Sequence, residues 1–148
     1  MFIFTLSTLS AQTNAVKANP LGLAVGFLNA GYEFGVADTQ SVMVSAAYYD
    51  NLGINGFGLD ASYRFYFGDE VLKGWHAEPV AGALFLSDAA NTSATVFNFG
   101  ATAGYQWVFG SGFLIDVYGG YTYATGGKSL AGFDAGLPVL GFAIGYAW

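Results

Sequence analysis

The sequence predicts an all-β fold, an eight-stranded antiparallel up-and-down transmembrane β-barrel, and three observations support this prediction. Only 9% of the 148 residues are charged, whereas 54% are hydrophobic and 18% are aromatic. Large apolar residues alternate with small or polar residues through most of the chain, and this is the period of a β-strand. The few charged residues lie between these segments or on their small, polar face. Such a chain would have an apolar exterior and a polar interior.

The first residues have the composition of a targeting segment. An apolar stretch runs from Phe2 to Leu9, and the small residues Ser10 and Ala11 follow it, as in the core and cleavage site of a signal peptide. No basic residue precedes this stretch, so a frayed terminal strand is the alternative. We expect residues 1–11 to be the remnant of a signal peptide and residues 12–148 to form a single barrel domain.

The first half of the chain contains four segments with this alternation. Near the start, Leu21, Leu23, Val25 and Phe27 alternate with glycine and alanine. In the fourth segment aromatic and aliphatic residues occupy one face, and both charged residues share the other face with glycine and serine. We expect strands at residues 17–27, 30–37, 41–49 and 54–67.

The second half contains four more. The alternation is clearest after Phe97, where phenylalanine, alanine, tyrosine and tryptophan at odd positions alternate with asparagine, threonine, glycine and glutamine at even ones. A membrane-spanning helix needs about 20 predominantly apolar residues, but the longest charge-free stretch, 89–115, contains many polar residues and glycines. We expect strands at residues 75–86, 95–109, 113–123 and 137–148.

The connections predict a meander closed on itself. Turn-like segments separate the expected strands. In an up-and-down barrel, successive connections of this kind lie at opposite ends. An open sheet edge in lipid would leave backbone groups without partners, so an even number of such strands indicates closure. One end would hold residues 37–40, 68–74 and 110–112, and the other 50–53, 87–94 and 125–136.

The position of the charges decides between two kinds of barrel. A soluble lipocalin-like barrel has its apolar residues inside and its charges outside. Most of the 14 acidic and basic residues fall in the expected connections, and Lys17 lies at a strand start. The remaining five form an expected network of charges in the lumen. They are Glu33, Asp60, Arg64, Glu78 and Asp116.

The last strand adds a more specific resemblance. It ends on an aromatic residue and resembles the signal by which the bacterial outer-membrane assembly machinery recognises barrel proteins. The residues that correspond to this signal are Phe142, Ile144, Tyr146 and Trp148.

Residues 17–148 as a whole resemble small OmpA-like and OmpX-like barrels. The segments KANPLGLAVGFLNAGYEF and GYQWVFGSGFLIDVYGGYTY are similar to an outer-membrane family known mainly as a domain of unknown function. The resemblance implies a bacterial outer-membrane location, contact with outer-membrane lipid, and the assembly machinery as a partner during biogenesis. It implies no established chemistry.

Several functions are disfavoured by the residues themselves. The net charge of −6 and the absence of any Lys/Arg cluster argue against nucleic-acid binding. The chain has no cysteine and a single histidine, His76, so we expect neither a metal site nor a cofactor. His76 shares a strand face with Glu78, but alanine stands where a neighbouring serine nucleophile would be expected, so we expect no catalytic residues.

The sequence therefore predicts a monomeric outer-membrane protein with a structural, anchoring or surface-interaction role and no enzymatic activity. A narrow cation-preferring channel is the alternative, because the expected lumen charges comprise four acids and one base. A lipid-modifying membrane enzyme and a soluble ligand-binding barrel are the other possibilities.

Overall fold

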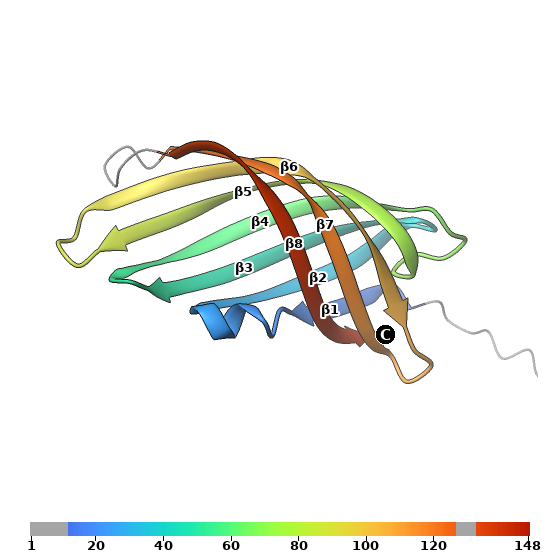
Figure 1. Cartoon of the computed structure of the whole chain (residues 1–148). Coiled ribbons are helices and arrows are strands. Elements are labelled where there is room, and N and C mark those ends of the chain that lie inside the picture. Colours follow the sequence, from blue (N-terminus) through green and yellow to red (C-terminus); the bar gives the residue numbers. More distant parts are fainter. Residues whose placement is uncertain (1–11, 127–132) are drawn as a thin grey trace, which may run out of the picture.

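The computed structural model describes residues 12–126 and 133–148, and within these ranges eight antiparallel strands form a closed barrel (Figure 1). Each strand pairs with the next, and the first pairs with the last. The predicted fold class is confirmed. No helix in the described ranges is long and apolar enough to cross a membrane. The elements are β1 (Asn14–Ala18), η1 (Gly22–Val25), β2 (Phe27–Ala37), β3 (Gln40–Asn51), β4 (Ile54–Tyr66), β5 (Gly74–Asp88), β6 (Ser93–Val108), β7 (Phe113–Gly126) and β8 (Phe133–Ala147).

The prediction of one strand over residues 17–27 is wrong. In the structure β1 ends at Ala18, the chain forms the short 3-10 helix η1, and β2 begins only at Phe27. The apolar alternation of this segment therefore belongs to a connection between two strands. Periodicity alone does not distinguish such a segment from a strand.

Local chemistry produces this break. The side-chain oxygen of Asn19 accepts hydrogen bonds from the backbone N–H groups of Leu21 at 3.0 Å and Gly22 at 3.2 Å, and such bonds favour a turn over a strand. Pro20 has no N–H to donate to a neighbouring strand. Gly26 ends η1 with a φ of 72°, in the left-handed region that glycine adopts without steric cost. The chain therefore leaves the sheet at this point.

The other predicted strands lie within a few residues of the observed ones, except that β7 and β8 are longer than expected. β7 continues to Gly126 and β8 begins at Phe133, so the connection expected at 125–136 is shorter. Residues 127–132 lie outside the described residues, as does the predicted signal segment at 1–11.

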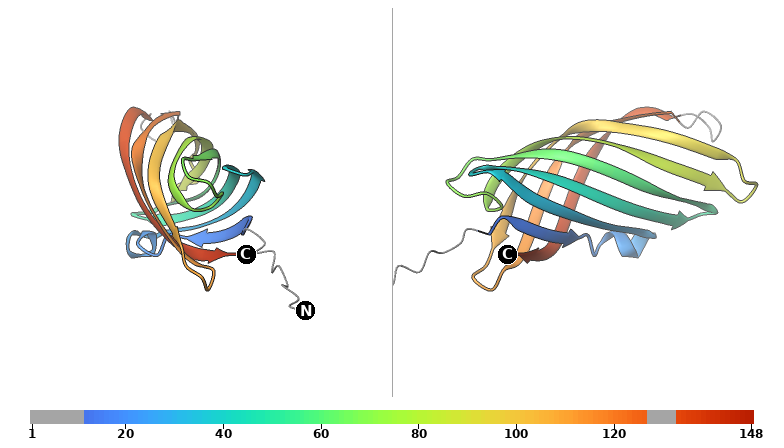
Figure 2. Two further views of the ribbon diagram at one scale, coloured as in Figure 1. Left: turned by 90° about the vertical axis from the view of Figure 1, so that its right-hand side faces the viewer. Right: turned by 180° about the vertical axis from the view of Figure 1, so that it is seen from behind.

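The connections alternate between two ends of the barrel (Figure 2). The end that holds residues 12–13 and Trp148 is called the terminal end, and the opposite end is called the distal end. At the distal end β3 and β4 are joined by Leu52 and Gly53, with φ of 53° and 78°, as in a tight hairpin turn. The terminal end also holds residues 38–39, 67–73 and 109–112, and the distal end also holds residues 19–26 and 89–92.

The terminal end of the barrel contains a small apolar core. The β4–β5 connection folds inward so that Val71 and Leu72 are buried with Tyr66 at the end of β4. Leu114 of β7 is also fully buried in this cluster. This core lies beneath the polar part of the lumen.

The two faces of the sheet differ in chemistry. Large apolar side chains point outward and are exposed, as in Leu59 on β4 at 51% and Phe99 on β6 at 54%. The alternate positions of the same strands point inward and carry the buried polar residues. The exposed outward residues include Val16, Tyr32, Val44, Tyr48, Phe57, Phe65, Trp75, Phe85, Phe97, Trp107, Phe113, Val117, Tyr121 and Tyr146.

Glycine is required where neighbouring strands approach closely. A β-carbon on Gly120 of β7 would lie 2.1 Å from the carbonyl oxygen of Ala101 and 2.6 Å from the Cα of Thr102, both backbone atoms of β6. We expect Gly120→Ala to lower the free energy of unfolding by about 1–3 kcal/mol, because the strands must move apart. Gly110→Ala is the control, since nothing lies within 4 Å of a β-carbon there. Equal stability of the two variants in denaturant titrations would contradict this expectation.

Candidate functional site

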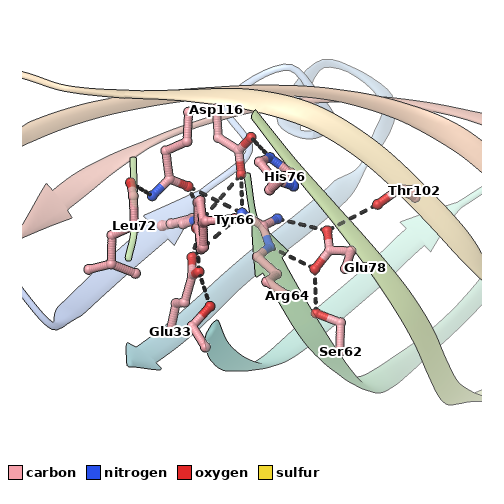
Figure 3. Close-up of polar contacts among 12 residues, drawn as sticks. Glu33, Ser62, Arg64, Tyr66, Leu72, His76, Glu78, Thr102 and Asp116 are labelled. Atoms are coloured by element: carbon pink, nitrogen blue, oxygen red, sulfur yellow. Dashed lines mark hydrogen bonds and ion pairs between the residues drawn. The ribbon is translucent and has the colours of Figure 1, made fainter. Parts of the chain in front are cut away.

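A group of buried charged side chains, together with the imidazole of His76, crosses the lumen just above the apolar core (Figure 3). Each member comes from the inward face of a strand, and each is at most 6% exposed. We call this group the lumen charge cluster. It consists of Lys17 of β1, Glu33 of β2, Arg64 of β4, His76 and Glu78 of β5, and Asp116 of β7.

Arg64 and Glu78 form the most directional contact of the cluster. Arg64 Nε donates to Glu78 Oε2 at 2.6 Å, and Nη2 donates to Oε1 at 2.8 Å. The β4–β5 register pairs Ser62 with Val80 and Phe65 with Ala77, so Arg64 and Glu78 face each other between these pairs. The planar guanidinium matches the two carboxylate oxygens, a geometry that makes such contacts stronger than single hydrogen bonds.

Arg64 also reaches two other strands with its third nitrogen. Nη1 donates to Asp116 Oδ2 on β7 at 2.7 Å and to the side-chain oxygen of Gln106 on β6 at 3.2 Å. The same nitrogen lies 3.5 Å from Glu33 Oε2 on β2. One side chain therefore connects strands on opposite sides of the barrel.

Lys17 and His76 are the two members of the cluster that the predicted network did not include. The prediction places Lys17 at a strand start. Its ammonium group forms ion pairs with Glu33 and, at 3.1 Å, with Asp116, and it donates to Gln106. A continuous strand from residue 17 to 27 would have placed Lys17 on the same face as Leu21 and Leu23. Because Asn19 and Pro20 end β1, that alternation does not apply, and Lys17 points inward. The Asn–Pro pair was the available signal.

Neutral side chains add hydrogen bonds to the carboxylates of Glu33 and Glu78. The hydroxyl groups of Ser41 and Tyr66 each donate to Glu33 Oε1 at 2.5 Å. Ser62 donates to Glu78 Oε2 at 2.6 Å, and Thr102 donates to Glu78 Oε1 at 3.0 Å. Buried charges are tolerated when they are both paired and hydrogen-bonded, and this cluster meets both conditions.

Gln106 links the cluster to the core below it. Its side-chain nitrogen donates to the carbonyl oxygen of Leu72 at 2.6 Å, while its side-chain oxygen accepts from Lys17 and Arg64. The β4–β5 connection, which fills the terminal end, is thereby held to the charges.

His76 does not pair with Glu78, although the two share a strand face. Its Nε2 lies 2.9 Å from Asp116 Oδ1. The centroid of its ring lies 5.7 Å from that of Tyr66, the residue of β4 with which His76 pairs. The Nδ1 atom has no hydrogen-bond partner among the described residues. The contact with Asp116 crosses the lumen, and spacing along one strand gives no information on such contacts.

Asp60 is a correction to the expected network, because the structure does not bring it to Arg64. The two lie four residues apart on β4, which corresponds to about 13 Å along an extended strand. Asp60 instead accepts a hydrogen bond from Asn98 of β6 at 2.9 Å. It faces the lumen at a level nearer the distal end.

The cluster contains three carboxylates, from Glu33, Glu78 and Asp116, and two permanent cations, from Lys17 and Arg64. The charges are therefore nearly balanced, whereas the sequence predicted four acids with one base. A cavity of about 60 Å³ lies next to the cluster, and Lys17, Arg64 and Asp116 form part of its wall.

The residues of the predicted assembly signal lie on and just beyond β8. Tyr146 and Trp148 are about half exposed, at 51% and 50%. Ala147, which lies between them, and Ala143, which precedes them, are buried. In the described part of the chain, no three His, Cys, Asp or Glu side chains are arranged to hold a metal ion.

Comparison with known proteins gives a fold and a family. The structure is similar to the crystal structure of the N-terminal β-barrel domain of OprF from Pseudomonas aeruginosa, with a TM-score of 0.57 and 14% sequence identity. The alignment covers 93% of this chain and 98% of that domain, so the likeness extends over the whole barrel and agrees with the expected resemblance to OmpA-like barrels at the level of fold. No curated protein matches the sequence. The profile of a protein of unknown function, DUF3575, matches residues 1–129, and the chain therefore belongs to the DUF3575 family.

Proposed function

We propose that this protein is an integral barrel of the bacterial outer membrane with a structural or anchoring role and a lumen closed by ion pairs. The observation that supports this proposal is the inverted distribution of side chains. Arg64 and three carboxylates are buried in the lumen, whereas large apolar residues are exposed around the outside. A water-soluble protein rarely exposes a continuous apolar surface of this kind, and a bilayer is the solvent that favours it.

The closed lumen favours an anchoring role over a channel. In an open pore, one more carboxylate than permanent cations would make the lumen selective for cations. Here, however, the ion pairs of Arg64 and Lys17 connect β1, β2, β5 and β7 across the interior. The side chains of Tyr66, Val71 and Leu72 fill the terminal end below them. An ion would have to break these contacts to pass.

The same contacts argue against catalysis. His76 is bound to Asp116 and buried against Tyr66, and no described contact joins it to a serine hydroxyl. A histidine that activates a nucleophile must lie within hydrogen-bond reach of it. The proposed partners are outer-membrane lipid and, during biogenesis, the assembly machinery that would recognise Phe142, Ile144, Tyr146 and Trp148. We propose a monomer.

Two measurements on the purified protein test this function. We expect the folded protein to require detergent or lipid for solubility and to migrate differently on gels before and after heating. We expect its conductance in planar bilayers to stay at background. Recovery as a soluble monomer without detergent would contradict the membrane location, and steady single-channel currents would favour the cation channel.

A further inference from the structure

The seam that closes the barrel is much shorter than the other strand pairings. β1 and β8 share four residue pairs, from Ala15–Ala147 to Ala18–Ile144. On its other side, β8 pairs with β7 along its length, from Phe113–Tyr146 to Gly126–Phe133. Within the described residues, the part of β8 from 134 to 143 therefore has a strand neighbour on one side only. Figure 1 shows this part of β8 running beside β7 and away from β1 and η1.

The direction of the backbone hydrogen bonds shows which residues of β8 face the gap. Trp148 and Asn14 of β1 exchange two bonds, at 3.1 and 2.9 Å, whereas Ala147 donates to Gly112 on the β7 side at 2.8 Å. Such bonds alternate along an antiparallel strand, and the β7–β8 register is unbroken. The even-numbered residues, among them Leu140 and Phe142, therefore direct their backbone N–H and C=O groups into the gap.

Pro138 is also an even-numbered residue of β8, and proline has no backbone N–H group. In sheets, proline is confined to positions whose N–H would face away from a partner strand, and it is one of the means by which edge strands avoid pairing with other chains. The gap is therefore poorly suited to receive an additional strand, either from another protein or from a second copy.

The lumen cavity is lined mainly by residues of β1, β2 and β3, and one side of it reaches this gap. Its lining includes Ala18 and Asn19, where β1 ends, and Ala143, where β8 loses its partner on that side. Lys17 and Tyr118 also border it. Its volume of about 60 Å³ exceeds the space that one water needs, so it can hold a small polar group.

The rim of the gap is apolar. On β8, Leu140 is 91% exposed, and on the segment between β1 and β2, Leu21 and Leu23 are 64% and 60% exposed. A molecule that lies in this gap would meet apolar side chains first and the polar cavity beyond them. This is the chemistry of an amphiphile, with an alkyl chain outside and a polar head inside.

We propose that the gap between β8 and residues 19–25 is a lateral opening through which a single-chain membrane amphiphile places its polar head in the cavity at Ala143. This proposal rests on the proposed membrane location. Unpaired backbone groups are costly in hydrocarbon, and the head would supply hydrogen-bond partners to those of β8. The cluster beside the cavity has three carboxylates and two permanent cations, so an uncharged head is favoured over an anionic one.

The absence of cysteine from the sequence permits a test with single thiols. Ala143→Cys places a thiol in the cavity, and Ala47→Cys is its matched control. Both residues are buried inward-facing alanines, at 7% and 8% exposure, but Ala47 lies on β3 with a paired strand on each side. Phe67→Cys, at a 71% exposed position just beyond the end of β4, reports whether the barrel is in the membrane at all, because a thiol near the membrane interface can ionise and react. Each variant is checked for heat-modifiable migration and labelled in vesicles with a long-chain N-alkyl maleimide confined to the bilayer.

We expect the bilayer reagent to label Ala143→Cys at least about tenfold faster than Ala47→Cys, because thiol reactivity follows access. A charged, water-soluble maleimide should not show this preference. Labelling of Phe67→Cys without faster labelling of Ala143→Cys would overturn the lateral opening alone. Failure of the bilayer reagent to label Phe67→Cys would instead contradict the membrane location.

The ligand is tested with 1-monooleoylglycerol as the probe. We expect it to slow the labelling of Ala143→Cys about tenfold when its concentration is ten times its dissociation constant, and to leave the labelling of Phe67→Cys unchanged. Oleate, which has the same chain and an anionic head, should protect less. Equal slowing of both variants would show dilution of the reagent and overturn specific binding, and stronger protection by oleate would overturn the preference for an uncharged head.

Discussion

Replacing Arg64 with methionine is expected to lower the free energy of unfolding by about 3–5 kcal/mol, because removing one partner of a buried ion pair leaves the others uncompensated. The side chain of Arg64 is 1% exposed and contacts Glu33, Glu78 and Asp116. After the substitution only Lys17 would remain as a permanent cation for the three carboxylates. Reversible denaturant unfolding in detergent or lipid measures the change.

Two further variants separate this effect from a general loss of packing. Arg64→Met combined with Glu78→Gln should be less destabilised than Arg64→Met alone, because the carboxylate bound most directly to Arg64 is removed with it. Asp60→Asn, which lies outside the cluster, should change stability far less. A loss below about 1 kcal/mol for Arg64→Met would indicate that water solvates the carboxylates and that the lumen is open.

Placing arginine at Leu59 is expected to lower the free energy of unfolding in a bilayer by about 2–4 kcal/mol, because a cation on the lipid face near the membrane midplane is poorly solvated. Leu59 lies in the middle of β4 and is 51% exposed on its outer face. In water the same substitution on an exposed strand would change little. Unfolding titrations in lipid vesicles measure the difference.

Phe67→Arg is the matched control, since Phe67 follows the end of β4 and is 71% exposed. Near a membrane interface the cost of arginine falls to about 0–1 kcal/mol. The difference between the two positions, rather than either value, is the signature of a bilayer. Similar small effects at both positions would favour a soluble barrel and contradict the proposed location.

The lumen charge cluster takes the place of an apolar core in the middle of the barrel. The large buried apolar residues of the described chain cluster at the terminal end, around Tyr66, Leu72 and Leu114, and the apolar residues buried elsewhere are alanines. Above them, the interior is held by charged and hydroxyl side chains from β1 to β7. Arg64 is central to this part because it contacts side chains on β2, β5, β6 and β7.

The sequence by itself determined which face points inward in the strands where large apolar and small polar residues alternate clearly, as in β4. Arg64 could be assigned to the lumen because Tyr63 and Phe65 belong to the opposite face, and a shift of one residue would reverse the whole strand. The same reasoning applied to Glu33 and Asp116, whereas the strand of Glu78 has small and mixed residues on both faces and gave no clear assignment. Alternation is a local property of an extended chain, so it can be read without knowledge of the neighbouring strands. The composition further indicated that the outer face meets something other than water.

Only the tertiary structure decided which inward-facing charges meet. Alternation gives the face of a residue but not its height in the barrel, and height depends on the register and tilt of every strand. Asp60 and Arg64 share a face and a strand, yet Asp60 lies with Asn98 while Arg64 meets side chains from four other strands. Lys17 joined the cluster only because the chain turns at Asn19. The short seam between β1 and β8 is likewise a property of closure, since no single strand contains the information on where its neighbour ends.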